Sequence, residues 1–153
     1  MSRRRVVVTG LGIVCPVGNT VEEAWSSLVA GKSGIGPITR FDAGPFACRI
    51  AGEVKGFDVA AHLPAKEARH MDTFIHYGLA AAIQAWKDSG LQVTEANAER
   101  IGVNIGSGIG GLPRIEETHA EFMERGPRRI SPFFVPASII NMISGHMSIM
   151  YGM

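Results

Sequence analysis

The chain has 153 residues, 46% of them hydrophobic and 19% charged, with a formal net charge of +1 at pH 7. This composition predicts a packed core and excludes a disordered tail, and the near-zero charge excludes bulk attraction to nucleic acid or to a membrane. No apolar run approaches the roughly 20 residues of a membrane span, and the run at residues 6–8 is too short for a signal peptide. We therefore expect a cytoplasmic protein.

Three consecutive valines predict a buried strand over residues 4–9, which leads into a glycine turn at residues 10–12. Asn19 or Thr20 is placed to cap a following helix that runs to Val29. A strand, a glycine turn and a helix in this order are typical of an α/β fold.

Glycines and prolines predict irregular structure over residues 34–64, with a short strand near residues 50–54. Apolar residues at helical spacing then predict the clearest helix of the chain, from Met71 to Gly90.

The last third of the chain contains a second candidate strand, over residues 100–106, and then a polar helix that begins at Pro113 and ends at Gly126. Two prolines predict an extended segment over residues 130–136, and the nearly uncharged residues 137–151 predict a buried helix. Ending on a buried helix, with few strands for four helices, indicates a piece of a larger α/β protein.

The two cysteines, Cys15 and Cys48, lie far apart, and the five histidines lack the spacing of a metal site. We expect a reducing compartment and no bound metal. No activating base or cation pattern surrounds either cysteine, so both are predicted to be inert. His119 is expected to be solvated, and His146 is expected to be a core residue.

A glycine motif, Gly106-x-Gly108-x-x-Gly111, fits the dinucleotide-binding fingerprint between a strand and a helix. That fingerprint also needs an acidic ribose ligand about 20 residues further on, at the end of a second strand. Here this distance falls on the glutamate-rich helix, which disfavours nucleotide binding but leaves it as an alternative.

Basic residues gather before the long helix and again before the Phe133-Phe134 pair. They form either solvated faces or a docking site for an acidic partner. The two clusters are Lys66, Arg69 and His70, and Arg125, Arg128 and Arg129.

Taken together, the segments resemble the elongating, type II β-ketoacyl-[acyl carrier protein] synthases along the whole chain. The motifs that carry the resemblance are VVVTGLG at residues 6–12, PVGN at 16–19, MD at 71–72, IGSGIGG at 105–111, ISPFFVP at 130–136 and NM at 141–142.

The resemblance implies an α/β, thiolase-like fold in αβαβα layers, of which residues 1–153 would be an incomplete N-terminal part of the first half. It implies a cytoplasmic homodimer with no organic cofactor and no catalytic metal. The reaction would be the decarboxylative Claisen condensation of fatty acid elongation. The family's nucleophilic cysteine and two catalytic histidines fall beyond Met153, so residues 1–153 alone are expected to be inactive.

The resemblance also implies binding roles within the chain. Ile109, beside Gly108 in the glycine-rich loop, matches the residue that lines the acyl pocket and gates chain entry. Phe134 matches the residue that closes the far end of the pocket across the dimer interface. The positions that match the landing zone of the acyl carrier protein are Lys66, Arg69, Arg128 and Arg129. A non-catalytic chain-length or partner subunit of polyketide assembly shares these features and remains the alternative function.

Overall fold

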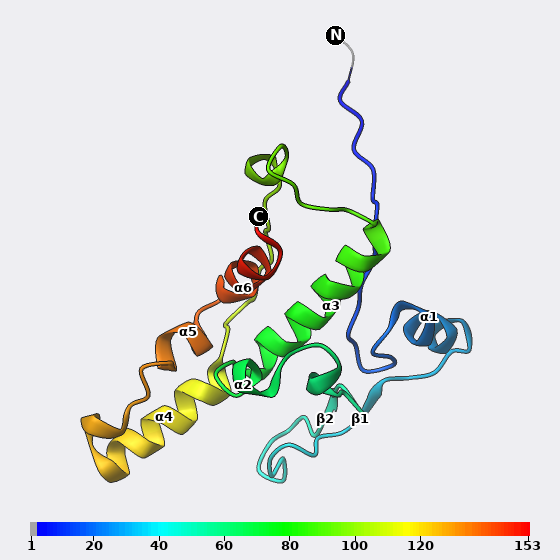
Figure 1. The fold of residues 1–153 in the computed structure, drawn as a ribbon. Coiled ribbons are helices and arrows are strands. Elements are labelled where there is room, and N and C mark those ends of the chain that lie inside the picture. The colour runs from blue at the N-terminus through cyan, green and yellow to red at the C-terminus, as the bar shows by residue number, and fades with distance from the viewer. Residues whose placement is uncertain (1–2) are drawn as a thin grey trace.

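The computed structural model describes residues 3–153 as a set of helices with one small two-stranded sheet (Figure 1). The elements in chain order are α1 (Val21–Val29), β1 (Ile35–Pro37), β2 (Ile50–Gly52), η1 (Val59–Ala61), α2 (Ala65–Ala68), α3 (Thr73–Ser89), η2 (Ala98–Arg100), α4 (Leu112–Arg125), η3 (Pro127–Arg129), α5 (Phe134–Ser138) and α6 (Met142–Tyr151).

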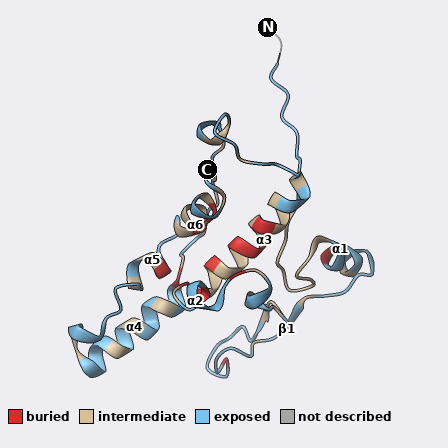
Figure 2. Ribbon diagram, viewed as in Figure 1, coloured by how far each residue is buried: buried red, intermediate tan, exposed pale blue. Residues whose placement is uncertain are grey.

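The core lies along α3, which packs against α6 (Figure 2). Ile75 and Leu79 are completely buried on α3, and Ile143 and Met147 meet them from α6. Gly78 permits this close approach, because an added Cβ would lie 2.6 Å from the Cδ1 atom of Ile143. Burial of this apolar stripe is the main source of stability in the described residues.

Helix α3 confirms the helix predicted from apolar spacing. It begins at Thr73 and ends at Ser89, and the residue that caps its C-terminus, Gly90, has a φ of 63°, the left-handed conformation that glycine adopts without steric cost. Helix α1 is also confirmed, because the Thr20 hydroxyl accepts a hydrogen bond from the Glu23 N–H at 3.2 Å.

The predicted strand over residues 4–9 is wrong, because this segment pairs with no strand among residues 3–153. Its apolar side chains are open to solvent, with Val6 93% exposed. Only the following glycine turn is anchored, by hydrogen bonds from the Leu11 N–H to Asp88 at 2.8 Å and from the Ile13 N–H to Gln84 at 3.3 Å. Valine content favours a strand, but a strand also needs a partner backbone to accept its hydrogen bonds.

The predicted strand over residues 100–106 is wrong for the same reason. Its burial alternates as in a strand, and Val103 and Ile105 pack on the core, but no backbone ladder forms within the part of the chain that the structure describes. Instead, the Ser144 hydroxyl on α6 accepts a hydrogen bond from the N–H of Ile105 at 2.9 Å and donates one to the carbonyl oxygen of Ile105 at 3.4 Å.

The strand expected near residues 50–54 is present as β2, which pairs antiparallel with β1. Helix α4 confirms the predicted polar helix, since Pro113 lies in its first turn and Gly126 follows its last residue. Among the described residues, no helix has both the length and the hydropathy to cross a bilayer.

The extended segment predicted over residues 130–136 is wrong, because α5 begins inside it. Pro136 is the third residue of α5, where the missing N–H would have had no partner in the helix, so this proline does not prevent helix formation. The single buried helix predicted over residues 137–151 is also wrong. The chain breaks at Ile139, which has extended backbone angles, and α6 leaves Ile149 79% exposed.

Candidate functional site

An apolar hollow of about 380 Å³ lies between the glycine-rich loop, α4 and α5. It is lined by Ile109, Ile115, Phe134, Val135, Ser138, Ile139 and Ile140. Two of the residues that sequence resemblance assigned to an acyl pocket, Ile109 and Phe134, therefore meet in one cavity. Its lining can hold an alkyl chain by excluding water from apolar surface.

Ser138 is the one polar side chain in this lining. Its hydroxyl donates a hydrogen bond to the carbonyl oxygen of Phe134 at 2.6 Å, within α5. That bond satisfies the hydroxyl and leaves the hollow without an unpaired side-chain donor in its wall. It also ties the two ends of α5 together, so that Phe134 is held by its own helix.

The glycine-rich loop positions Ile109 through its last two glycines. Gly110 has a φ of 87°, and its N–H donates to the Ser107 hydroxyl at 3.2 Å. The N–H of Gly111 donates to the carbonyl oxygen of Ser138 at 2.9 Å. The loop is therefore fixed against the end of α5, whereas Gly108 has open space around it and does not line the hollow.

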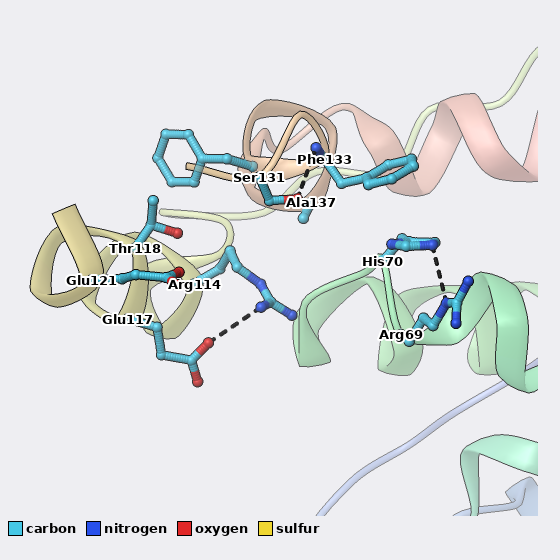
Figure 3. Close-up of a pocket in the computed structure, with 10 residues that line it drawn as sticks. Arg69, His70, Arg114, Glu117, Thr118, Glu121, Ser131, Phe133 and Ala137 are labelled. Carbon is cyan, nitrogen blue, oxygen red and sulfur yellow. Dashed lines mark hydrogen bonds and ion pairs between the residues drawn. The ribbon is translucent and has the colours of Figure 1, made fainter. Parts of the chain in front are cut away.

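A smaller polar cleft of about 120 Å³ is lined by residues at the end of α2, on α4, and in and before α5 (Figure 3). Its charged groups are Arg69, Arg114, Glu117 and Glu121, and Arg114 pairs with Glu117 at 3.3 Å. Phe134 lines both the hollow and the cleft.

His70 connects α2 to the segment before α5. Its ring stacks on Phe133 with centroids 3.8 Å apart, and its Nε2 atom lies 3.1 Å from the Nε atom of Arg69 (Figure 3). The residue next to Arg69 in the chain thus contacts Phe133, which directly precedes Phe134.

The predicted carrier-binding residues are all exposed, but the structure does not bring them into one patch. Lys66 and Arg69 belong to the region of α2, which lies beside the first turn of α4, whereas Arg128 and Arg129 follow the last turn of α4 in η3 (Figure 1). Within residues 3–153 none of the four forms an ion pair.

Arg125, in the same basic cluster, differs from Arg128 and Arg129. It pairs with Glu121 at 3.9 Å and with Glu124 at 3.3 Å, so its charge is already balanced by its own helix. The basic cluster therefore contains one arginine in ion pairs, Arg125, and two without an ion pair in residues 3–153, Arg128 and Arg129.

Residues expected to be inert lie outside the hollow. Cys15 is half-buried in a tight turn closed by its hydrogen bonds with Gly18, and Cys48 is exposed. His119 is exposed on α4 as predicted. The expectation of a core residue is wrong for His146, which is only half-buried on α6. Among residues 3–153, no group of three His, Cys, Asp or Glu side chains is placed to hold a metal ion.

Asp72 was missed by sequence reasoning as a site residue, although it belongs to a motif of the resemblance. Asp72 is 6% exposed as a residue, and its carboxylate accepts a hydrogen bond from the Arg114 N–H, in the first turn of α4, at 3.0 Å. The nucleotide fingerprint would place a phosphate at this helix start, where a buried carboxylate now takes the N–H group. This geometry argues against the nucleotide-binding alternative.

Comparison with known proteins identifies the family. Residues 3–153 match the family described as Beta-ketoacyl synthase, N-terminal domain. The chain belongs to the beta-ketoacyl synthase family. This membership agrees with the family suggested by the sequence motifs and covers every residue that the structure describes.

Individual members of the family give the same result. The chain is 60% identical over all of its 153 residues to 3-oxoacyl-[acyl-carrier-protein] synthase 2 of Vibrio cholerae serotype O1, and it spans 37% of that protein's length. It is 55% identical over 151 residues to 3-oxoacyl-[acyl-carrier-protein] synthase 2 of Coxiella burnetii, and spans 36% of that protein.

Among solved structures, a type II polyketide acyl-carrier protein in complex with its ketosynthase contains a chain that matches with a TM-score of 0.80 and 28% identity. The match covers 99% of this chain and 41% of that one. The expected ketosynthase fold class is thereby confirmed, although two of the three strands predicted from the sequence, over residues 4–9 and 100–106, are not formed within residues 3–153.

Proposed function

We propose that the intact protein is a 3-oxoacyl-[acyl carrier protein] synthase of fatty acid elongation, and that residues 1–153 are the N-terminal portion of its first thiolase-like half. The observation that carries the proposal is the meeting of Ile109 and Phe134 in one apolar hollow. The 60% identity to the Vibrio cholerae synthase along the whole chain supports the same function.

In the proposed reaction an acyl group passes from the thiol of its carrier to an enzyme cysteine, and the carrier thiol leaves with the proton. Malonyl-carrier then loses carbon dioxide, and the resulting enolate carbon attacks the acyl thioester. The new carbon–carbon bond replaces the carbon–sulfur bond, and the cysteine thiolate leaves and is protonated again. By the family resemblance, the cysteine and the two histidines of this chemistry would lie outside residues 1–153.

Within this scheme residues 1–153 supply binding. Ile109 and Phe134 would contact the alkyl chain, which the hollow separates from water, and Gly108 would leave room for its entry. Lys66, Arg69, Arg128 and Arg129 would attract the acidic carrier protein, because their charges are exposed and face no ion-pair partner in residues 3–153. The homodimer and the cytoplasmic location stay predictions.

The test is condensation by the intact protein. Purified protein is mixed with acyl-carrier and malonyl-carrier, and the product is measured by mass spectrometry. We expect a 3-oxoacyl-carrier two carbons longer than the acyl donor, with one carbon dioxide released for each product. Carrier binding without any product would contradict the proposal.

A non-catalytic chain-length subunit is the second candidate. A solved structure of the ishigamide ketosynthase/chain length factor, whose name covers both kinds of subunit, contains a chain that matches this one with a TM-score of 0.76 and 31% identity. The identity to the synthases is about twice as high, which favours the enzyme. A residue other than cysteine at the nucleophile position of the intact protein would support the subunit instead.

A further inference from the structure

Helix α4 begins without a capping side chain of its own. Its N-cap residue is Gly111, and Pro113 in its first turn has no N–H group. The N–H of Leu112 donates to the carbonyl oxygen of Gly110 at 3.0 Å, and that of Ile115 donates to Gly111 at 3.0 Å. The remaining donor of the first turn is the N–H of Arg114, which a normal capping side chain would satisfy.

Asp72 supplies this missing cap from another helix. Its Oδ2 atom accepts from the Arg114 N–H at 3.0 Å, across 42 positions of sequence. Asp72 also occupies the N-cap position of α3, but its side chain makes no hydrogen bond there. The backbone carbonyl oxygen of Asp72 instead accepts from the N–H groups of the third and fourth residues of α3, Ile75 at 3.0 Å and His76 at 3.3 Å.

The same carboxylate bounds the space around the glycine-rich loop. A Cβ atom on Gly111 would lie 3.0 Å from Asp72 Oδ2 and 2.9 Å from the Cα atom of Ser138, so Gly111 is wedged between α3 and α5. At Gly106 and Gly108, in contrast, an added Cβ atom would meet nothing within 4 Å. The loop is therefore tight at its end and open at its start, and Ile109 lies directly before the tight end.

We infer that Asp72 is a positioning residue. From the start of α3 it caps α4, and this cap holds Gly110 and Gly111 against α5 and so fixes Ile109 at the edge of the apolar hollow. The inference rests on the proposed acyl-binding role of Ile109. Asp72 contacts no alkyl chain itself. Its effect passes through the backbone of the loop. If Ile109 is already fixed before the acyl chain binds, binding does not cost the entropy of ordering it.

The first measurement is amide hydrogen exchange of the intact protein, which needs no substrate. We expect Asp72→Ala to speed exchange at residues 106–114, and Asp72→Asn to restore protection because its amide oxygen also caps helices. Thr20→Ala is the matched control, since Thr20 caps α1 and does not line the hollow. Unchanged exchange at residues 106–114 in Asp72→Ala would overturn the inference, whatever the enzyme catalyses.

The second measurement is acyl-chain selectivity. We expect Asp72→Ala to lower kcat/KM for a long acyl donor relative to a short one by about tenfold, the factor given by the loss of one capping interaction. The change should lie in the KM of the acyl-carrier, with the KM of malonyl-carrier unchanged and with Asp72→Asn close to wild type. An equal loss for both donors, or the same shift in Thr20→Ala, would overturn the inference.

A variant that fails to fold does not end the test. Asp72→Leu then replaces Asp72→Ala, because leucine fills the same buried space without an oxygen atom that could accept from the Arg114 N–H. The same faster exchange and the same selectivity change are expected. Absence of any condensation product in the wild-type protein would count against the proposed function, while the exchange result would still decide the role of Asp72.

Discussion

Helices α3 and α4 use their apolar residues in opposite ways. Helix α3 buries Ile75, Leu79 and Ile83 against the rest of the protein, whereas α4 has no buried residue and exposes 70% of Met123 (Figure 2). The α3 face is closed, so its apolar surface stabilises the fold. The face formed by α4 and α5 remains open over the described residues, so within them its apolar surface is not used for packing.

The largest expected effect is on stability, and it tests the contrast between α3 and α4 directly. Leu79→Ala should lower the free energy of unfolding by about 2–5 kcal/mol, because it leaves a cavity in a completely buried position. Met123→Ala, the matched change on α4, should alter it by less than about 0.5 kcal/mol. Urea denaturation of the intact protein measures both. A similar loss in Met123→Ala would show that another part of the protein covers α4.

The open face gives the next largest effect. Ile109→Phe should reduce kcat/KM for long acyl donors relative to short ones by about tenfold or more, because a larger side chain fills the mouth of the hollow. Ile109→Leu conserves volume and should change the ratio little. Condensation assays with donors of increasing length measure the ratio, and an equal loss at every length would remove Ile109 from the pocket.

The same contrast explains which parts of the fold the sequence predicted. Helix α3 could be predicted because apolar spacing and Gly90 are local signals, and a helix forms its hydrogen bonds within one segment. Residues 4–9 and 100–106 carry equally clear strand composition, but a strand depends on a partner that is distant in sequence. Composition indicates a preference for the strand conformation, but it does not indicate whether a partner strand lies beside the segment.

The candidate site was predictable to a similar extent. Ile109 and Phe134 were found through motif resemblance, and the structure brings them together although 25 positions separate them. Asp72 was missed because its partner is a backbone N–H of another helix, and no sequence period marks such a contact. The one available signal was indirect. The N-cap position of α4 is Gly111, which has no side chain to cap the N–H groups of the first turn.

Charges on the rim of the open face should have a smaller effect. Replacing Arg128 and Arg129 together with Gln should weaken carrier binding on the order of fivefold at low ionic strength and reduce its salt dependence. Arg125→Gln is the control, since Glu121 and Glu124 already balance that charge. Binding is measured by titration at two salt concentrations. Equal weakening by the control would show that net charge matters rather than position.

The smallest expected effect lies at the border of the closed face, at His146 on α6. Burial lowers the pKa of His146 below its ordinary value of 6.5, and the nearby Glu67 carboxylate opposes this shift only in part. The unfolded chain therefore binds a proton at a higher pH than the folded protein, so the free energy of unfolding decreases as pH falls from 6.5 through the lower folded pKa. His146→Gln should make stability less dependent on pH in this window. Urea denaturation at several pH values measures the slope, and an unchanged slope would mean that the closed face does not extend to His146.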